Sequence, residues 1–156
     1  MRYRHPEVWG DGTHETHALM LEAMDGIDFN GKSVLDIGTG SGILAIEARK
    51  RGAGYVLAVD IDDEALSLAR ENSNGIDLLK SDLTESVYRT FDVVIANLTQ
   101  PVQAENLKTV RKVFHNNTVL LASYYSHLTP NHEGLDVDKI YHGKDWDIYI
   151  FKKQGG

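Results

Sequence analysis

Short apolar runs alternate with longer amphipathic segments along most of the chain. The runs predict buried strands, because a strand inside a parallel sheet is covered on both faces and loses the alternation of polar and apolar positions. Between the runs, apolar positions recur at helical spacing. This pattern predicts strands at 33–37, 55–60, 76–80, 92–97 and 118–124, and helices at 15–24, 42–52, 62–74 and 101–114.

The ends of the predicted helices carry matching local signals. Acidic residues 62–64 open one helix, where the helix dipole favours negative charge, and the basic run 49–51 closes another. Gly52 suits a C-terminal stop, and Pro101 suits a first helical position. Local chemistry and periodicity therefore indicate the same elements.

The last part of the chain has a different pattern. Two strand-like segments, 135–142 and 146–153, are separated only by Gly143–Asp145, a loop of hairpin length. We therefore expect an α/β domain with a Rossmann-like, seven-stranded, mostly parallel sheet, a C-terminal antiparallel hairpin at one edge and helices on both faces. Residues 1–156 are expected to form a single domain, with an N-terminal arm and helix at 1–30 and the core at 31–156.

Composition narrows the class of protein. The 156 residues include no cysteine, which excludes disulfides and thiolate metal sites. A formal net charge of -7 disfavours a nonspecific nucleic-acid partner, which needs a basic surface. No apolar run approaches the roughly 18 residues of a membrane-spanning helix, and the N-terminus has no signal-peptide core. We expect a soluble, cytoplasmic protein with no membrane partner.

The turn after the first predicted strand is rich in glycine. It lies in "VLDIGTGSGILAIEA", and its glycines are Gly38, Gly40 and Gly42. Glycines at such a turn remove Cβ atoms, so that backbone N–H groups can approach a ligand. The dinucleotide fingerprint is G-x-G-x-x-G, but here the third glycine position of that pattern holds Ile43. The spacing therefore disfavours a dinucleotide.

Two acidic residues flank this turn. Asp36 lies two residues before the first glycine, where a carboxylate would oppose a pyrophosphate and favour a cation. Asp60 ends the second predicted strand, about 20 residues farther on, where a carboxylate can accept hydrogen bonds from ribose hydroxyls. These residues predict a nucleoside ligand with a ribose and a positive charge, and no phosphate.

Four motifs in this order resemble the class I S-adenosylmethionine-dependent methyltransferases: "VLDIGTGSG", "AVDID", "KSDL" and "FDVVIANL". The resemblance covers nearly the whole chain, and it implies S-adenosylmethionine as the cofactor. It implies that Asp36 helps to hold the cofactor's ammonium, Asp60 the ribose, and Asp82 with Leu83 the adenine. The core residues that it assigns to cofactor binding are Asp36, Gly38, Thr39, Gly40, Asp60, Ile61, Asp82, Leu83 and Asn97.

The segments "WGDGTHETHALMLEAM" and "ANLTQP" resemble, more narrowly, the ribosomal-protein lysine methyltransferases that modify a large-subunit stalk-base protein. In that family a loop followed by threonines and a helix closes over the cofactor. The resemblance places Thr13 and His14 in this loop, with Thr16 and His17 after it, so all four become cofactor-binding residues. Asn97 matches the asparagine after the fourth strand, and we expect it to be catalytic by positioning the acceptor nitrogen.

These observations predict an N-methyltransferase that acts on a lysine of a ribosomal protein or of another protein. The chain starts almost at the loop, so the resemblance implies a catalytic domain without the family's N-terminal substrate domain. The sequence therefore leaves open whether a partner subunit supplies substrate recognition.

The sequence also leaves other functions open. A small-molecule methyltransferase would need a cap over its pocket, for which 126–135 is one candidate, and a non-catalytic cofactor-binding subunit would keep the same motifs. A nucleic-acid amino-methyltransferase is less favoured, because residues 97–100 lack the Pro-Pro-aromatic sequence whose ring stacks on a flipped base. We predict no metal, since His14 and His17 have no convincing third ligand.

Overall fold

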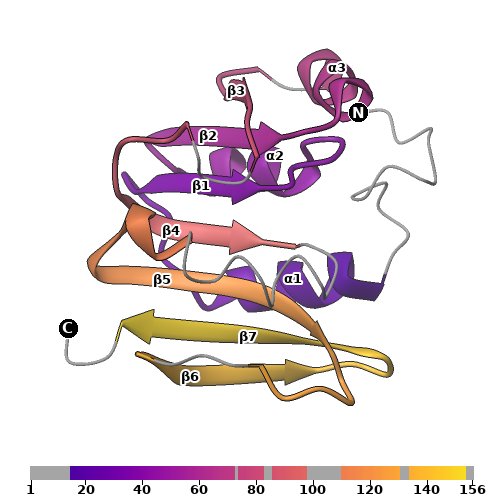
Figure 1. Cartoon of the computed structure of the whole chain (residues 1–156), viewed down its shortest axis with the longest axis vertical. Coiled ribbons are helices and arrows are strands. Elements are labelled where there is room, and N and C mark those ends of the chain that lie inside the picture. The colour runs from indigo at the N-terminus through magenta and orange to yellow at the C-terminus, as the bar shows by residue number, and fades with distance from the viewer. Residues whose placement is uncertain (1–14, 73, 83–85, 98–109, 131–133, 154–156) are drawn as a thin grey trace.

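The computed structural model describes residues 15–72, 74–82, 86–97, 110–130 and 134–153. Within them, seven strands form a sheet in the order β3-β2-β1-β4-β5-β7-β6 (Figure 1). Neighbours from β3 to β5 pair in parallel, whereas β7 runs antiparallel to both β5 and β6. The predicted seven-stranded, mostly parallel sheet with a C-terminal antiparallel hairpin is therefore confirmed. The strands are β1 (Ser33–Ile37), β2 (Tyr55–Asp60), β3 (Asp77–Lys80), β4 (Phe91–Ala96), β5 (Phe114–Tyr125), β6 (Leu135–His142) and β7 (Trp146–Lys153).

The described helices are α1 (Glu15–Asp25), α2 (Ile43–Lys50), α3 (Asp63–Asn72) and a short 3₁₀ helix, η1 (Arg111–Val113). Helices α1 and α2 bury apolar residues such as Met24 and Leu44 in one core with Val34, Val93 and Ile148 of the sheet. Helix α3 packs on β2 and β3 at the other end of the sheet (Figure 1). No described helix is both long and apolar enough to cross a membrane.

The second face of the sheet has its own core. Leu35, Ile37 and Phe151 of the sheet are buried there together with Val113 of η1. Most of the helix predicted at 101–114 falls outside the described residues. Helices on both faces therefore stay a prediction.

The C-terminal end predicted for that helix, residue 114, was wrong. Residues 111–113 form η1, and β5 begins at Phe114 rather than at Thr118. Phe114 pairs with Phe91 of β4, and the Thr118 hydroxyl donates to the Phe91 carbonyl at 2.6 Å. Pairing with β4 thus overrides the local helical pattern.

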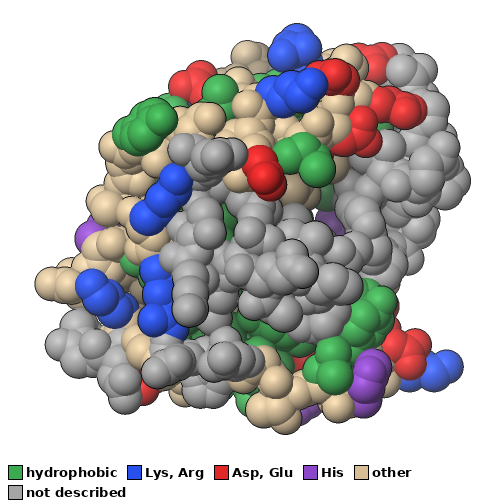
Figure 2. Space-filling view, in the orientation of Figure 1, with side chains coloured by type: hydrophobic (Ala, Val, Ile, Leu, Met, Phe, Trp, Pro, Cys, Tyr) green, Lys and Arg blue, Asp and Glu red, His purple; other side chains and the backbone are tan. Residues whose placement is uncertain are grey.

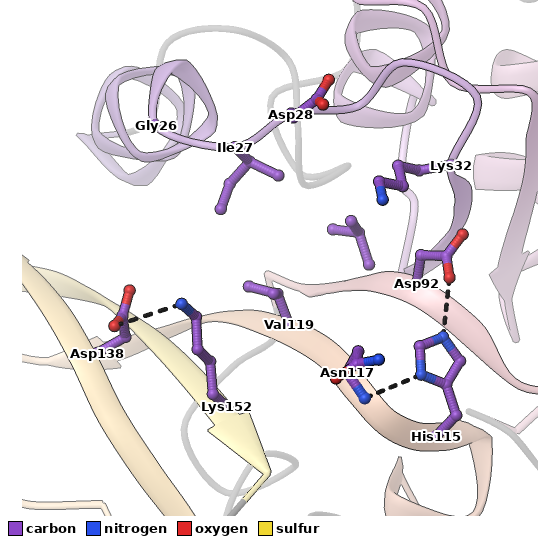
Figure 3. Close-up of a pocket in the computed structure, with 11 residues that line it drawn as sticks. Gly26, Ile27, Asp28, Lys32, Asp92, His115, Asn117, Val119, Asp138 and Lys152 are labelled. Carbon is purple, nitrogen blue, oxygen red and sulfur yellow. Dashed lines mark hydrogen bonds and ion pairs between the residues drawn. The ribbon is translucent and has the colours of Figure 1, made fainter. Parts of the chain in front are cut away.

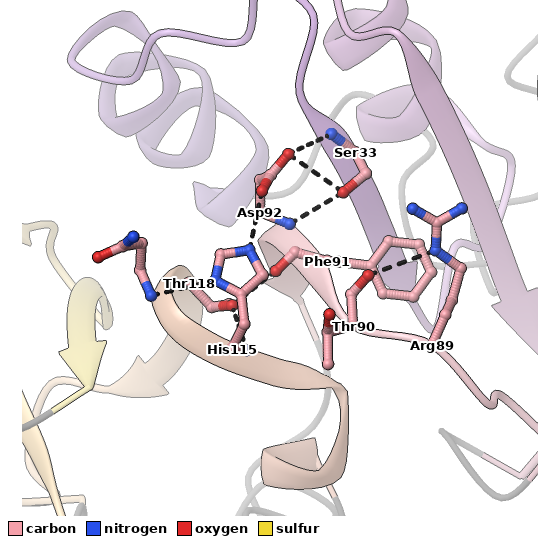
Figure 4. Close-up of polar contacts among 8 residues, drawn as sticks. Ser33, Arg89, Thr90, Phe91, Asp92, His115 and Thr118 are labelled. Carbon is pink, nitrogen blue, oxygen red and sulfur yellow. Dashed lines mark hydrogen bonds and ion pairs between the residues drawn. The ribbon is translucent and has the colours of Figure 1, made fainter. Parts of the chain in front are cut away.

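Three strands are tied together at the amino edge of the parallel sheet (Figure 4). Asp92 of β4 accepts hydrogen bonds from the backbone N–H and the hydroxyl of Ser33 in β1, at 2.9 and 3.2 Å. Its other carboxylate oxygen lies 2.8 Å from Nε2 of His115 in β5. The backbone hydrogen bond from Ser33 holds the pKa of Asp92 below its usual value, and His115 acts in the same direction.

Replacing Asp92 with alanine is expected to lower the free energy of unfolding by about 2 kcal/mol, because several charge-assisted hydrogen bonds are lost together. A carboxylate with a lowered pKa stabilises the fold above its unfolded pKa, and that contribution is lost as the pH falls through the folded pKa. The difference between the proteins should therefore shrink in acid. Urea denaturation measures it, with Asp136→Ala, an exposed carboxylate on β6, as the control. Equal destabilisation by the two substitutions would contradict this role.

Candidate functional site

Four of the predicted site residues, Gly38, Asp60, Asp82 and Asn97, lie at the carboxyl ends of the parallel strands, the usual ligand edge of an open α/β sheet. Ile37 of β1 pairs with Val59 on one side and with Ala96 on the other. Gly38 therefore follows β1 between Asp60, the last residue of β2, and Asn97, which follows β4. The Ser81 N–H donates to the Asp60 carbonyl at 3.1 Å, so the next residue, Asp82, lies at the same edge.

The glycine turn is held by hydrogen bonds that point into the protein. The N–H groups of Gly38 and Thr39 both donate to the Val59 carbonyl, at 2.9 and 3.0 Å. The Gly40 N–H donates to Asp60 Oδ2 at 2.9 Å. Gly38 and Gly40 adopt positive φ angles of 70° and 57°, which glycine tolerates at little cost. These three N–H groups are therefore used within the protein, and the assignment of Gly38, Thr39 and Gly40 to the cofactor stays a prediction.

Asp36 is the buried anion of the site, with 1% of its surface exposed. Its carboxylate accepts a hydrogen bond from the Thr39 hydroxyl at 2.7 Å and one from the Ala45 backbone N–H in the first turn of α2. Burial raises the pKa of Asp36 to about 7, the Thr39 hydrogen bond opposes this rise, and the nearby Asp60 charge adds to it. Because this carboxylate caps the helix end that a phosphate would use, the site suits a cation rather than a phosphate.

Two backbone N–H groups hold the Asp60 carboxylate in place. Besides its bond to Gly40, its Oδ1 accepts the Asp62 N–H at 3.0 Å. Both oxygens keep lone pairs that can accept from a diol. The next residue, Ile61, is 63% exposed, so an apolar surface lies beside this carboxylate. The pair suits a ribose with an attached flat base.

Other predicted site residues have distinct environments. The Thr39 hydroxyl is used in orienting Asp36, and Asn97 is buried directly after β4. Thr16 is buried in the first turn of α1, with His17 beside it partly exposed. Thr13, His14 and Leu83 lie outside the described residues. In the described part of the chain, no group of three or more His, Cys, Asp or Glu residues could hold a metal.

Sequence reasoning missed two supports of the glycine turn. The Asn72 side-chain amide, at the end of α3, donates to the Ser41 carbonyl at 3.3 Å. Gly42 lies so close to α3 that a Cβ on it would be 3.2 Å from the Ala69 Cβ. Both contacts join residues far apart in sequence, and no local pattern signals them.

A family model described as ribosomal protein L11 methyltransferase (PrmA) matches residues 8–154 of this chain. The ribosomal protein L11 methyltransferase of Caldicellulosiruptor bescii is 44% identical over 120 residues, covering 74% of this chain and 40% of that protein. The enzyme of the same name from Fusobacterium nucleatum is 34% identical over 162 residues, covering 94% of this chain and 52% of that protein. The chain therefore spans about half the length, or less, of these relatives.

Solved structures share the fold. The ribosomal protein L11 methylase of Lactobacillus delbrueckii subsp. bulgaricus superposes with a TM-score of 0.81 at 26% identity, covering 91% of this chain and 80% of that one. An RNA methyltransferase of Salinibacter ruber, in complex with S-adenosyl-L-homocysteine, has a TM-score of 0.74 at 15% identity, covering 89% of this chain and 92% of that one. At that identity the second likeness concerns the fold alone.

Proposed function

The chain belongs to the ribosomal protein L11 methyltransferase (PrmA) family, and from this premise we propose that it is an S-adenosylmethionine-dependent N-methyltransferase acting on a lysine of a ribosomal protein. Ribosomal protein L11 is the first candidate substrate, because the relatives carry that name. The observation that carries the proposal is the buried Asp36 carboxylate beside a glycine turn whose described N–H groups are used internally. This arrangement rejects phosphate and accepts a cationic nucleoside.

Bound S-adenosylmethionine supplies an electrophilic methyl group on a sulfonium. In this proposal Asp36, oriented by Thr39, accepts hydrogen bonds from the ammonium of the cofactor. Asp60 accepts from the ribose hydroxyls, and Ile61 covers one side of the adenine. Asp82 and Leu83 contact the adenine edge, as the family resemblance implies.

In this proposal Asn97 positions the amine that accepts the methyl group. It follows β4 next to Gly38, so its side chain or its carbonyl can orient an amine for in-line transfer. An attacking lysine must be neutral, and removing its ammonium from water as it enters the site lowers its pKa. Burial of Asn97 is consistent with a site that excludes water.

In this proposal the N-terminal segment and a partner subunit also contribute to function. Residues 1–30 form the arm and helix that close over the cofactor, with Thr13, His14, Thr16 and His17 as its contact residues. Helices cover both faces of the sheet. The protein acts in the cytoplasm, and a partner subunit contributes to substrate recognition.

Transfer of labelled methyl groups tests the activity. The chain is incubated with labelled S-adenosylmethionine and purified ribosomal protein L11, and mass spectrometry locates the modified residue. We expect label on a lysine of L11, and a decrease of about a hundredfold with Asn97→Ala, since a misplaced acceptor loses orientation. Cofactor affinity should fall far less in that variant. Cofactor binding without transfer to L11, both with the purified protein and with cell extract that supplies a partner subunit, would contradict the proposed substrate.

Replacing Asp60 with alanine is expected to weaken S-adenosylmethionine binding at least about tenfold, because a charge-assisted hydrogen bond to the ribose is lost. Calorimetric titration measures this, with NAD as the competing ligand class. Asp63→Ala is the matched control, since Asp63 is a nearby exposed carboxylate that pairs with Lys80. Tight NAD binding by the unmodified chain would overturn the proposed cofactor.

A further inference from the structure

Helix α1 begins at the edge of the sheet where the candidate site lies. Figure 1 shows its start on the side toward which β1, β2 and β4 point, and just after its other end Gly26 and Ile27 line a cavity with the amino ends of β4 and β5 (Figure 3). The first turn of α1 contains Thr16 and His17, which the proposed function assigns to the cofactor. Because the ends of a helix fray most easily, contacts from outside the helix decide how well these two residues keep their place.

The carboxylate of Glu15, the first residue of α1, binds the loop between β6 and β7. It accepts the Lys144 N–H, and both of its oxygens lie 3.2 Å from the Asp145 backbone nitrogen. These partners are 129 and 130 residues away in the sequence. Hydrogen bonds to an ionised acceptor are stronger than neutral ones, so this contact anchors the start of α1 to the hairpin.

The same loop approaches α1 so closely that a side chain at Gly143 has no room. A Cβ there would lie 2.6 Å from Leu19 Cδ1 and 2.6 Å from the Trp146 carbonyl oxygen, and it would also meet the Glu15 carboxylate. Leu19 lies one helical turn after Glu15, so both residues face the loop from the same side of α1. The anchor therefore combines hydrogen bonds with close packing.

The hairpin loop is also fixed to the sheet. Trp146, which follows the loop, pairs in register with Tyr125 at the end of β5, and their rings lie 4.2 Å apart. The next residue, Asp147, is 4% exposed and accepts the Ser126 hydroxyl at 3.0 Å. Strand β5 is the neighbour of β4, which ends at the candidate site. The loop is thus a firm support at the ligand edge of the sheet.

Only the backbone of the loop takes part in the anchor. The Lys144 and Asp145 side chains are exposed, and Figure 2 shows both acidic and basic side chains at this corner of the molecule. A substitution of Lys144 therefore keeps the N–H group that Glu15 binds. This makes Glu15 the residue whose side chain can be tested by itself.

We propose that Glu15 is a positioning residue of the methyl-transfer site: by binding the loop 143–145, it holds Thr16 and His17 in place for the cofactor. This inference rests on the proposed function, which gives those two residues their contact with the cofactor. With the anchor, the cofactor meets a turn that is already ordered. Without it, the apparent affinity falls by the fraction of molecules in which the turn is ordered.

Calorimetric titration with S-adenosylmethionine tests this role in Glu15→Ala and Glu15→Gln. We expect Glu15→Ala to bind the cofactor about tenfold more weakly, the effect of a turn that is ordered in about one molecule in ten. Glu15→Gln should restore the affinity, because its side-chain carbonyl can accept both N–H groups. In methyl-transfer assays, Glu15→Ala should raise the KM for the cofactor and leave kcat unchanged, since the acceptor residue Asn97 follows β4.

Two control variants separate this role from a general loss of stability. Asp25→Ala removes a 2.8 Å ion pair with Arg51 at the other end of the same helix, and Lys144→Ala removes only an exposed side chain. Neither should change the affinity for the cofactor. An equal loss in Asp25→Ala, or unchanged binding by Glu15→Ala, would overturn the inference alone. Absence of binding by the unmodified chain would overturn the proposed cofactor as well.

Discussion

Replacing Asp36 with asparagine is expected to weaken binding of S-adenosylmethionine about a hundredfold and to stabilise the free protein at pH 8. Affinity falls because the cofactor's ammonium loses a buried carboxylate partner, and such losses commonly cost about 2–5 kcal/mol. Stability rises because an ionised carboxylate with 1% exposure is costly to bury, whereas the amide has a similar shape and no charge. Calorimetry measures the affinity, and thermal denaturation measures the stability.

The pH dependence follows from the raised pKa of Asp36, about 7 against an ordinary 3.8. Between these values the folded state holds a proton that the unfolded state has released, so this group makes stability fall as the pH rises. The loss is complete above about pH 7. The melting temperature of Asp36→Asn should therefore exceed that of the unmodified chain by at least about 3 °C at pH 8, and the two should converge near pH 4.

Cofactor affinity gives a second, independent readout. Binding of the cationic cofactor requires the ionised carboxylate, so affinity should rise up to about tenfold per pH unit below pH 7, and Asp36→Asn should not show this rise. Asp136→Asn, at an exposed carboxylate on β6, should alter neither property. A variant that binds the cofactor normally would remove Asp36 from the site.

Replacing Gly42 with valine is expected to lower the free energy of unfolding by about 3 kcal/mol. Gly42 has φ +85°, which costs a residue with a Cβ about 1–2 kcal/mol. Its Cβ would also lie 3.2 Å from the Ala69 Cβ, and a branched side chain would push α3 away from the glycine turn. Urea denaturation measures the loss.

The matched control is Gly31→Ala. Gly31 has a similar φ of +72°, but a Cβ there would meet nothing within 4 Å. Gly31→Ala should lose only about 1–2 kcal/mol, the backbone cost alone. Gly42→Ala should fall between the two. If Gly42→Val and Gly31→Ala cost the same, the close approach of α2 and α3 does not constrain the turn.

The sequence alone determined the strand pattern and the class of fold. The bounds of β1, β2, β6 and β7 agree with the predicted ones, because each is an apolar or alternating run that ends at turn residues. The hairpin follows from its short loop, and the spacing of Gly38, Gly40 and Gly42 already disfavoured a dinucleotide. These features are local, so neighbouring residues in the chain are sufficient to specify them.

Only the tertiary structure decided how these parts act together. The start of β5 depends on pairing with Phe91 in β4, a partner that local propensity does not identify. The N–H groups of the glycine turn point to Val59 and Asp60 because β2 lies beside β1. Asp36 has a raised pKa because α2 and the sheet bury it. Such properties depend on packing between distant segments, where burial and hydrogen-bond partners are set, and a linear pattern of residue types does not contain them.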